Sequence, residues 1–296
     1  MEVEMEDVAF PLACLRAFAL ARNQIALLWL GQSSFALRVG GAEAGGEKIV
    51  LLDPFLSPHP DRLAPPSFPA HQAVGVDAVL CTHEHLDHFD VAALRAIMVA
   101  SPHARLVVPR PIVALAVGAG ISRDRVIGAQ PGEPVALDGF SVHPIPAMHG
   151  VEMADAYTFG QELSAGLYRY LGYVVETRAG GVCVYHAGDT IPYGALKTWL
   201  NGLRIDVALL PINGRDAARE ARNLVGNLDH REAAHLAVDI GADVLIPMHY
   251  DLIATNLGYP DKVVDIVTRD HLDLTVVVLA RERPFIYTGL GPTRLR

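Results

Sequence analysis

Short apolar runs alternate with polar, glycine-containing turns along most of the chain, a pattern typical of a strand-rich α/β protein. The first three runs, Ile25 to Leu30, Ser34 to Val39 and Lys48 to Leu52, follow one another closely enough to form a series of hairpins. Later runs predict further strands over Val76 to Cys81, Leu106 to Val108, Phe140 to Pro146, Gly172 to Glu176, Val182 to Tyr185, Val207 to Leu210 and Val244 to Ile246.

Three segments instead show helical features. Phe89 to Ala100 repeats apolar residues at helical spacing and ends before a Ser-Pro pair. Asp229 and Glu232 resemble a capping box before a helix over Ala233 to Ile240. The apolar stretch Val8 to Leu20 is interrupted by a proline and an arginine, which favours an N-terminal surface helix over a membrane anchor.

A cluster of polar side chains follows the predicted strand Val76 to Cys81. His83, His85, Asp87 and His88 stand almost side by side there. Imidazole nitrogen and carboxylate oxygen are the usual protein ligands of Zn²⁺ and related divalent ions. Burying several histidines beside a carboxylate costs desolvation free energy unless they find a partner. The spacing therefore favours a metal site over a polar loop with incidental histidines.

Three residues further along extend the cluster to a set that suits two metal ions. His149, Asp189 and His249 each follow an apolar, strand-like run. Taken singly, each would be interpreted as an ordinary hydrogen-bonded histidine or a turn aspartate. Together they predict convergence on one sheet edge, because open α/β architectures place their sites at the ends of successive strands.

The order of these residues, an H-x-H-x-D-H motif followed by His149, Gly188-Asp189 and His249, resembles the metallo-β-lactamase superfamily. The resemblance covers nearly the whole chain. It implies a four-layer αββα sandwich of the α/β class and a metal-dependent hydrolase with two divalent metal ions per chain. The implied ligands are His83, His85 and His149 for one ion, Asp87, His88 and His249 for the second, and Asp189 as the bridge.

Shorter stretches resemble one branch of that superfamily. Trp29 to Phe35, Leu52 to Pro54 and Pro211 to Arg215 are similar to the branch that contains L-ascorbate-6-phosphate lactonase. Affinity order favours Zn²⁺ over Mn²⁺ at such sites, the lactonase resemblance makes Mn²⁺ a second candidate, and the ligand set also accepts Fe. Related flavin-dependent diiron proteins carry a carboxylate where His85 stands, so the histidine favours hydrolysis over redox chemistry.

Length and charge narrow the class of protein. The 296 residues are 51% apolar and contain no long linker or repeat, which predicts one domain over residues 1–296. A formal charge of −9 argues against a nucleic-acid-binding protein, because that affinity rests on clustered cations. Cys14, Cys81 and Cys183 lack paired spacing, so we expect buried, reduced thiols and a cytoplasmic location. No window predicts a membrane span, and self-association is a further expectation from the resemblance.

The predicted chemistry follows from what two close cations do to water. They lower the pKa of a bound water molecule, so that hydroxide attacks near neutral pH while the second cation polarises the substrate. Asp87 is the candidate to orient that hydroxide and take up its proton, and metal ligation alone is its alternative role. The favoured substrate is a lactone or related ester of a small anionic metabolite. A phosphodiesterase or phospholipase D-like hydrolase is the alternative enzyme, and a metal-holding structural or regulatory protein is the alternative without turnover.

Residues outside the ligand set are predicted to recognise the substrate or to support the site. The predicted substrate-binding residues are Asn213, Arg215, Arg222 and Asn223, since an Arg- and Asn-rich loop near a metal centre can hold a phosphate or carboxylate. A solvated face paired with nearby carboxylates is the alternative for this loop. Asp53 is expected to hydrogen-bond a ligand histidine, with turn formation as its alternative role. Residues 151–170 are expected to form a lid, a packed excursion or an oligomer contact.

Overall fold

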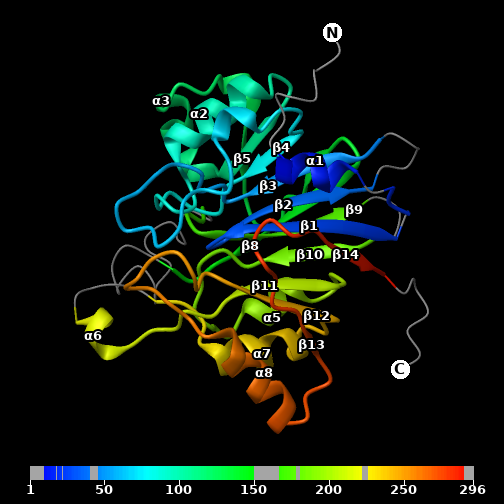
Figure 1. Ribbon diagram of the computed structural model, residues 1–296, viewed down its shortest axis with the longest axis vertical. Coiled ribbons are helices and arrows are strands. Elements are labelled where there is room, and N and C mark those ends of the chain that lie inside the picture. The colour runs from blue at the N-terminus through cyan, green and yellow to red at the C-terminus, as the bar shows by residue number, and fades with distance from the viewer. Residues whose placement is uncertain are drawn as a thin grey trace.

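Two seven-stranded β-sheets lie face to face in the computed structural model, which describes residues 10–17, 19–21, 23–40, 46–149, 167–177, 181–221 and 226–289 (Figure 1). The first sheet has the order β14-β1-β2-β3-β4-β5-β6, and the second has the order β13-β12-β11-β10-β9-β8-β7. The strands of the first sheet are β1 (Gln24–Gly31), β2 (Ser34–Val39), β3 (Lys48–Leu52), β4 (Ala78–Leu80), β5 (Arg105–Pro109), β6 (Val126–Ala129) and β14 (Phe285–Thr288). Those of the second sheet are β7 (Val135–Leu137), β8 (Phe140–Pro146), β9 (Leu171–Thr177), β10 (Cys183–His186), β11 (Val207–Pro211), β12 (Val244–Met248) and β13 (Thr275–Val276).

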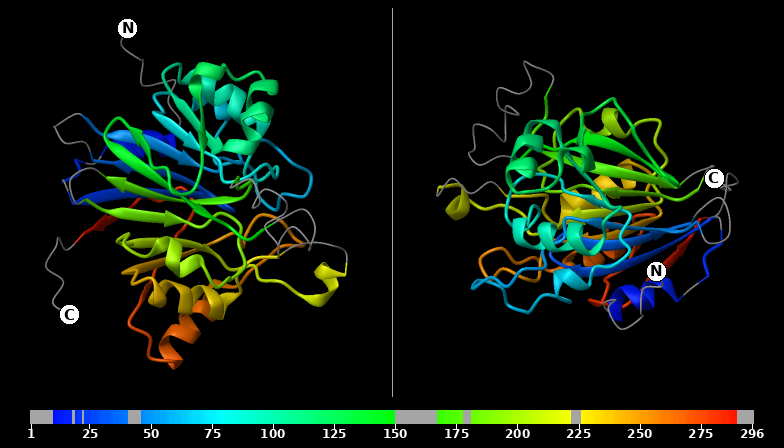
Figure 2. Two further views of the ribbon diagram at one scale, coloured as in Figure 1. Left: turned by 180° about the vertical axis from the view of Figure 1, so that it is seen from behind. Right: turned by 90° about the horizontal axis from the view of Figure 1, so that it is seen from above.

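Helices cover the outer faces of both sheets, as the views from behind and from above also show (Figure 2). They are α1 (Phe10–Arg16), α2 (Val91–Ala100), α3 (Val113–Gly118), α5 (Leu196–Leu200), α6 (Ala217–Glu220), α7 (His230–Asp239) and α8 (Pro260–Arg269). The 3₁₀ turns are η2 (Ala70–Gln72), η3 (Arg110–Ile112) and η4 (Arg123–Arg125). Helices α2 and α3 lie outside the first sheet, and α5, α7 and α8 lie outside the second. The layers are therefore helix, sheet, sheet and helix, which confirms the predicted αββα class.

Strand β1 shows how the sequence pattern builds these layers. Successive side chains of a strand point to opposite faces of the sheet. Leu27 and Trp29 point into the core between the two sheets, whereas Ala26 and Leu28 point into the core beneath α1 and α2. Because both faces are covered, the strand is apolar throughout instead of alternating with polar residues.

The structure has a strand at each predicted position, and the observed ends differ from the predicted ends by at most two residues. The predicted capping box is also confirmed, since Asp229 accepts from the backbone N–H of Glu232 and Glu232 accepts from that of Asp229. The expected N-terminal surface helix is present as α1, Phe10–Arg16, which is shorter than the apolar stretch and packs on the first sheet through its fully buried Leu12 and Leu15.

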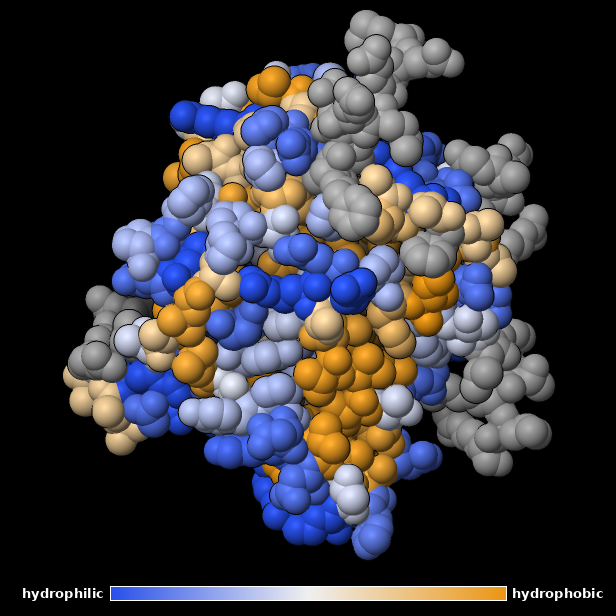
Figure 3. Space-filling view, viewed as in Figure 1, coloured by the Kyte–Doolittle hydropathy of each residue, from blue (hydrophilic) through white to orange (hydrophobic). Residues whose placement is uncertain are grey.

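Two further expectations concern cysteines and membranes. Cys81 and Cys183 are buried and Cys14 is partly buried, and all three are free thiols. No helix within the described ranges is long and apolar enough to cross a membrane. On the face in Figure 3, apolar residues gather below the centre, over the region of β12, β13 and the segment before β14.

Candidate metal centre

The strand directions bring the predicted ligands to one edge of the sandwich. In the first sheet β3 and β4 are parallel, so Asp53 and the loop 83–88 follow neighbouring strand ends. In the second sheet β10, β11 and β12 are parallel, so Asp189 and His249 emerge at a common edge. His149 follows β8, which runs in the direction of β10 because both strands are antiparallel to β9. Both sheets thus contribute side chains to one site.

Three histidines form the first group. Nε2 of His83 lies 3.0 Å from Nδ1 of His85, and Nε2 of His149 lies 3.2 Å from the same nitrogen. The ligand atoms of all three lie within 4.8 Å of one another. His83 and His149 are buried and His85 is partly buried, so the nitrogens meet away from bulk water. This is the set expected from the resemblance around one ion.

Asp87, His88 and His249 form the second group, and Asp189 lies between the two. Oδ2 of Asp87 is 3.3 Å from Nε2 of His249 and 3.6 Å from Nε2 of His88. Oδ2 of Asp189 is 3.3 Å from Nε2 of His249 and 3.6 Å from Nε2 of His149. One carboxylate therefore faces both groups, the position expected of a bridging ligand.

Burial and charge divide the site into two electrostatic halves. Burial lowers the pKa of His83 well below its usual value and that of His149 to about 3, so both imidazoles are neutral at physiological pH. Burial alone would also lower the pKa values of His88 and His249. The carboxylates, Asp189 foremost, raise both, and the pKa of His249 reaches about 9. One half thus presents neutral nitrogen ligands, and the other presents carboxylates that require positive charge beside them.

Unpaired buried atoms show that these residues fit a metal ion. Nε2 of His88 and Oδ1 of Asp189 are buried and have no hydrogen-bond partner among the described residues. These two atoms face each other at 3.3 Å, outside hydrogen-bond geometry. Buried polar atoms normally have partners. A divalent cation, which binds nitrogen and carboxylate ligands, would be such a partner here.

Asp53 fixes the ring of His88. Oδ2 of Asp53 lies 2.6 Å from Nδ1 of His88, and both side chains are fully buried. The backbone N–H and the hydroxyl of Thr82 each donate to the Asp53 carboxylate at 2.8 Å. A carboxylate that accepts the Nδ1 proton leaves Nε2 available as the ligand atom. The structure thus places Asp53 in the contact that the sequence suggested.

His186 supports the loop that carries Asp189. It is fully buried, with Nε2 2.8 Å from the carbonyl oxygen of Ser33, and the N–H of Gly188 donates to its Nδ1 at 3.2 Å. Burial lowers its pKa, so a neutral ring donates through Nε2 and accepts through Nδ1. Gly188 has φ of 61°, and a Cβ there would lie 2.7 Å from the carbonyl oxygen of Leu171. Glycine before Asp189 is therefore required by geometry.

Gln32 is a site residue that sequence reasoning missed. It is fully buried in the turn between β1 and β2, and its Nε2 donates to Oδ2 of Asp87 at 3.1 Å. Its backbone is held on both sides, since its N–H donates to Asp251 at 2.7 Å and its carbonyl accepts from the N–H of His249 at 3.0 Å. Gln32, Asp53 and His249 all have left-handed backbones, with φ of 53°, 43° and 59°. Strained backbone of this kind clusters at functional sites.

Two of the four residues predicted to bind substrate in the Arg- and Asn-rich loop can be placed in the structure. Arg222 and Asn223 lie outside the described residues. Arg215 donates to both carboxylate oxygens of Glu232, in one case at 2.7 Å, and to the carbonyl oxygen of Asn227 at 2.9 Å. Asn213 is buried, and its carbonyl oxygen accepts from Arg219 at 3.0 Å. Arg215 and Asn213 thus pack within the loop, and their predicted contact with substrate stays a prediction.

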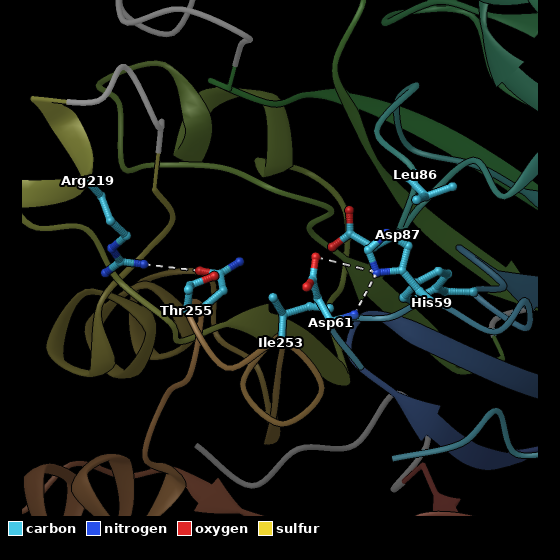
Figure 4. Close-up of a pocket in the computed structure, with 9 residues that line it drawn as sticks. His59, Asp61, Leu86, Asp87, Arg219, Ile253 and Thr255 are labelled. Atoms are coloured by element: carbon cyan, nitrogen blue, oxygen red, sulfur yellow. Dashed lines mark hydrogen bonds and ion pairs between the residues drawn. The ribbon is translucent and has the colours of Figure 1, made fainter. Parts of the chain in front are cut away.

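A pocket opens beside Asp87, with a volume of about 290 Å³ (Figure 4). It is lined by Phe55, His59, Asp61, Leu86, Asp87, Arg219, Ile253, Thr255 and Asn256. Asp87 is the one predicted ligand among these residues, so the pocket meets the metal site at that carboxylate. Of the segment 151–170, expected to form a lid, a packed excursion or an oligomer contact, residues 151–166 lie outside the described chain. Arg169 is described, and it pairs with Glu84 next to the ligand histidines.

Comparison with known proteins agrees with this fold and site. Residues 48–250 match the family model for the Beta-lactamase superfamily domain. A UPF0173 metal-dependent hydrolase of Methanopyrus kandleri is 30% identical over 253 residues, which cover 86% of this chain and 96% of that protein. One of Aeropyrum pernix is 33% identical over 250 residues, which cover 80% of this chain and 86% of that protein.

Solved structures share the fold at lower identity. Igni18, a metallo hydrolase from Ignicoccus hospitalis, superposes with a TM-score of 0.67 at 22% identity and covers 90% of this chain and 99% of its own. An isothiocyanate hydrolase from Delia radicum gut bacteria superposes with a TM-score of 0.68 at 17% identity, over 89% of this chain and 99% of its own. The fold and its homologues define a metal-dependent hydrolase. The chain belongs to the β-lactamase superfamily, and the two relatives described above are UPF0173 metal-dependent hydrolases.

Proposed function

We propose that this metal-dependent hydrolase cleaves a lactone or related ester of a small anionic metabolite, with two divalent ions, Zn²⁺ or Mn²⁺, bound by the seven predicted ligands. The observation that carries the proposal is the junction between site and pocket. Asp87 belongs to one ligand group and also lines the pocket. A substrate in the pocket would therefore place its scissile bond beside the ligand groups.

Different residues of the site have different roles in the proposed reaction. Bound divalent ions would supply a hydroxide nucleophile near neutral pH and polarise the carbonyl of the ester. The Asp87 carboxylate would orient the attacking water, take up its proton and return that proton to the departing alcohol oxygen, while Gln32 holds one oxygen of that carboxylate. Asp53 keeps His88 in the tautomer that leaves Nε2 free to bind. Phe55, Leu86 and Ile253 provide the apolar part of the pocket lining.

Metal analysis and a substrate panel test this function together. We expect about two ions per natively purified chain by mass spectrometry, and fewer in the His85→Ala and His249→Ala variants, each of which removes a ligand from one group. The metal-loaded protein should then hydrolyse lactones faster than bis-p-nitrophenyl phosphate, and Asp189→Ala protein that still folds should hydrolyse neither. Faster cleavage of the phosphodiester would replace the ester proposal with a phosphodiesterase. If the protein binds no metal after reconstitution with zinc, manganese and iron, both the ester proposal and the phosphodiesterase alternative are wrong.

A further inference from the structure

The pocket beside Asp87 has two chemically different ends. His59, Asp61 and Leu86 lie near Asp87 at one end, and Arg219 lies at the other, with Ile253 and Thr255 between them (Figure 4). Among the described residues that line the pocket, Arg219 alone carries a permanent positive charge. A pocket of this volume accepts a small metabolite whose two ends reach both sites.

Arg219 is held in place while part of its donor capacity stays unused. Its Nε donates to Asp216 at 2.6 Å, Nη1 to the side-chain oxygen of Asn256 at 3.1 Å, and Nη2 to the carbonyl oxygen of Asn213 at 3.0 Å. A guanidinium has five N–H groups. One N–H on each terminal nitrogen is thus left without a partner among the described residues. The side chain is only 14% exposed, so it is ordered before a ligand arrives.

The charge of Arg219 is also incompletely balanced. Asp216, its ion-pair partner, is 52% exposed on the solvent side, where water screens the interaction. Arg215 differs in this respect, because it pairs with Glu232 through both terminal nitrogens and is absent from the pocket lining. A half-screened guanidinium with two unused donors binds a carboxylate or phosphate through paired, charge-assisted hydrogen bonds.

We propose that Arg219 anchors an anionic group of the substrate at the end of the pocket opposite to Asp87. The substrate class is an ester or lactone whose carboxylate or phosphate is separated from the scissile bond by a short uncharged segment lying along Ile253 and Thr255. This inference rests on the proposed function for the position of the scissile bond. Arg219 is thus a specificity-determining residue, and Asn213 and Asn256 position it.

Two pairs of lactones that differ only by an anionic group test the anchor. The first pair is paraconate, a carboxylated γ-butyrolactone, and its neutral methyl ester. The second is glucono-δ-lactone 6-phosphate and glucono-δ-lactone. Turnover of each is measured with metal-loaded wild type, Arg219→Ala and Arg219→Lys. Arg231→Ala is the matched control, because Arg231 on α7 forms a surface ion pair with Asp270, the residue after α8, and neither residue lines the pocket.

We expect Arg219→Ala to lower kcat/KM for the anionic member of at least one pair by about 10- to 100-fold, the usual effect of losing a charge-assisted contact. The neutral member should change by less than about twofold, since it makes no ion pair with the guanidinium. Arg219→Lys should recover part of the loss, and Arg231→Ala should match wild type. The pair that responds identifies carboxylate or phosphate as the recognised group. An equal loss on both members of each pair, or no loss, would overturn the anchor.

A binding measurement separates failure of the anchor from failure of the proposed function. If wild type hydrolyses none of the four lactones, the ester proposal is wrong, and the same compounds serve as ligands in calorimetric titrations. The anchor then requires that wild type bind an anionic member more tightly than its neutral counterpart and that Arg219→Ala abolish the difference. Equal binding of the two members by wild type would refute it.

Discussion

At the scale of single residues, the amide of Gln32 offers a sharp test of the metal site. Gln32→Met keeps the volume of this fully buried side chain but removes the N–H that holds Oδ2 of Asp87. A freed carboxylate samples other orientations, so the Asp87, His88 and His249 group should bind its ion about 10- to 100-fold more weakly. Competition with a chelator measures this affinity. The affinity of the three-histidine group for its ion should not change.

Ser33→Ala is the control for Gln32→Met. Ser33 is the next residue in the same turn, and its buried hydroxyl has no hydrogen-bond partner among the described residues. Its loss should leave both metal affinities unchanged. Equal weakening of the two groups in Gln32→Met would show that the turn supports the fold of the whole site and does not position Asp87.

The sequence points to the candidate ligand residues more directly than to the residues that surround them. His83, His85 and His88 are recognisable because their chemistry is rare at such spacing and has no packing purpose. Gln32 carries no such signal, since its contact with Asp87 depends on a left-handed turn after β1 and on the order in which β1 to β4 lie in the first sheet. Arg219 and Arg215 are chemically alike, and only the position of Glu232 shows which guanidinium is already engaged.

At the scale of elements, Arg215 connects the loop after β11 to the start of α7. It pairs with Glu232, and Glu232 also accepts the backbone N–H of Asp229 in the capping box. We expect Arg215→Ala to lower the free energy of unfolding by about 1–2 kcal/mol, because a partly buried ion pair and a helix cap weaken together. Urea denaturation measures the loss.

The same variant separates a structural role from substrate binding. The preference of Arg215→Ala protein for anionic over neutral lactones should equal that of wild type. Arg231→Ala, which breaks an exposed ion pair between α7 and the residue after α8, should change the free energy of unfolding by less than about 0.5 kcal/mol. A lost anionic preference with unchanged stability would instead restore Arg215 as the substrate anchor.

Elements were predictable in proportion to how completely their sequence is buried. Strands in the middle of each sheet, such as β2 and β11, are buried throughout because both faces are covered, and β11 is apolar along its whole length. Strands β7 and β13 lie at sheet edges, are short and keep exposed residues, so their pattern resembles a loop. Strand β14 pairs with β1, although the two are separated by nearly the whole sequence. No local sequence pattern predicts such a contact.

At the scale of the whole molecule, the candidate metal site is built from both sheets. His83 and Asp87 follow β4 of the first sheet, whereas His149, Asp189 and His249 follow strands of the second. Ions bound between them would act as a link across the open edge of the sandwich. The apolar core between the sheets needs no such link, because it is packed from strands of both sheets along their length.

Removal of metal should therefore loosen one edge and leave the core folded. An ion present at about 1,000 times its dissociation constant stabilises the native state by about 4 kcal/mol, which corresponds to a shift in Tm on the order of 10 °C. We expect chelation to lower Tm by this amount and to speed hydrogen exchange in the loops 82–89 and 187–191. Exchange within β1 and β2 should stay slow. Asp189→Ala protein, which lacks the residue between the two groups, should respond much less to chelator. An equal rise in exchange across both sheets would mean that the ions hold the entire sandwich together, and no change in Tm or exchange would contradict metal binding at this edge.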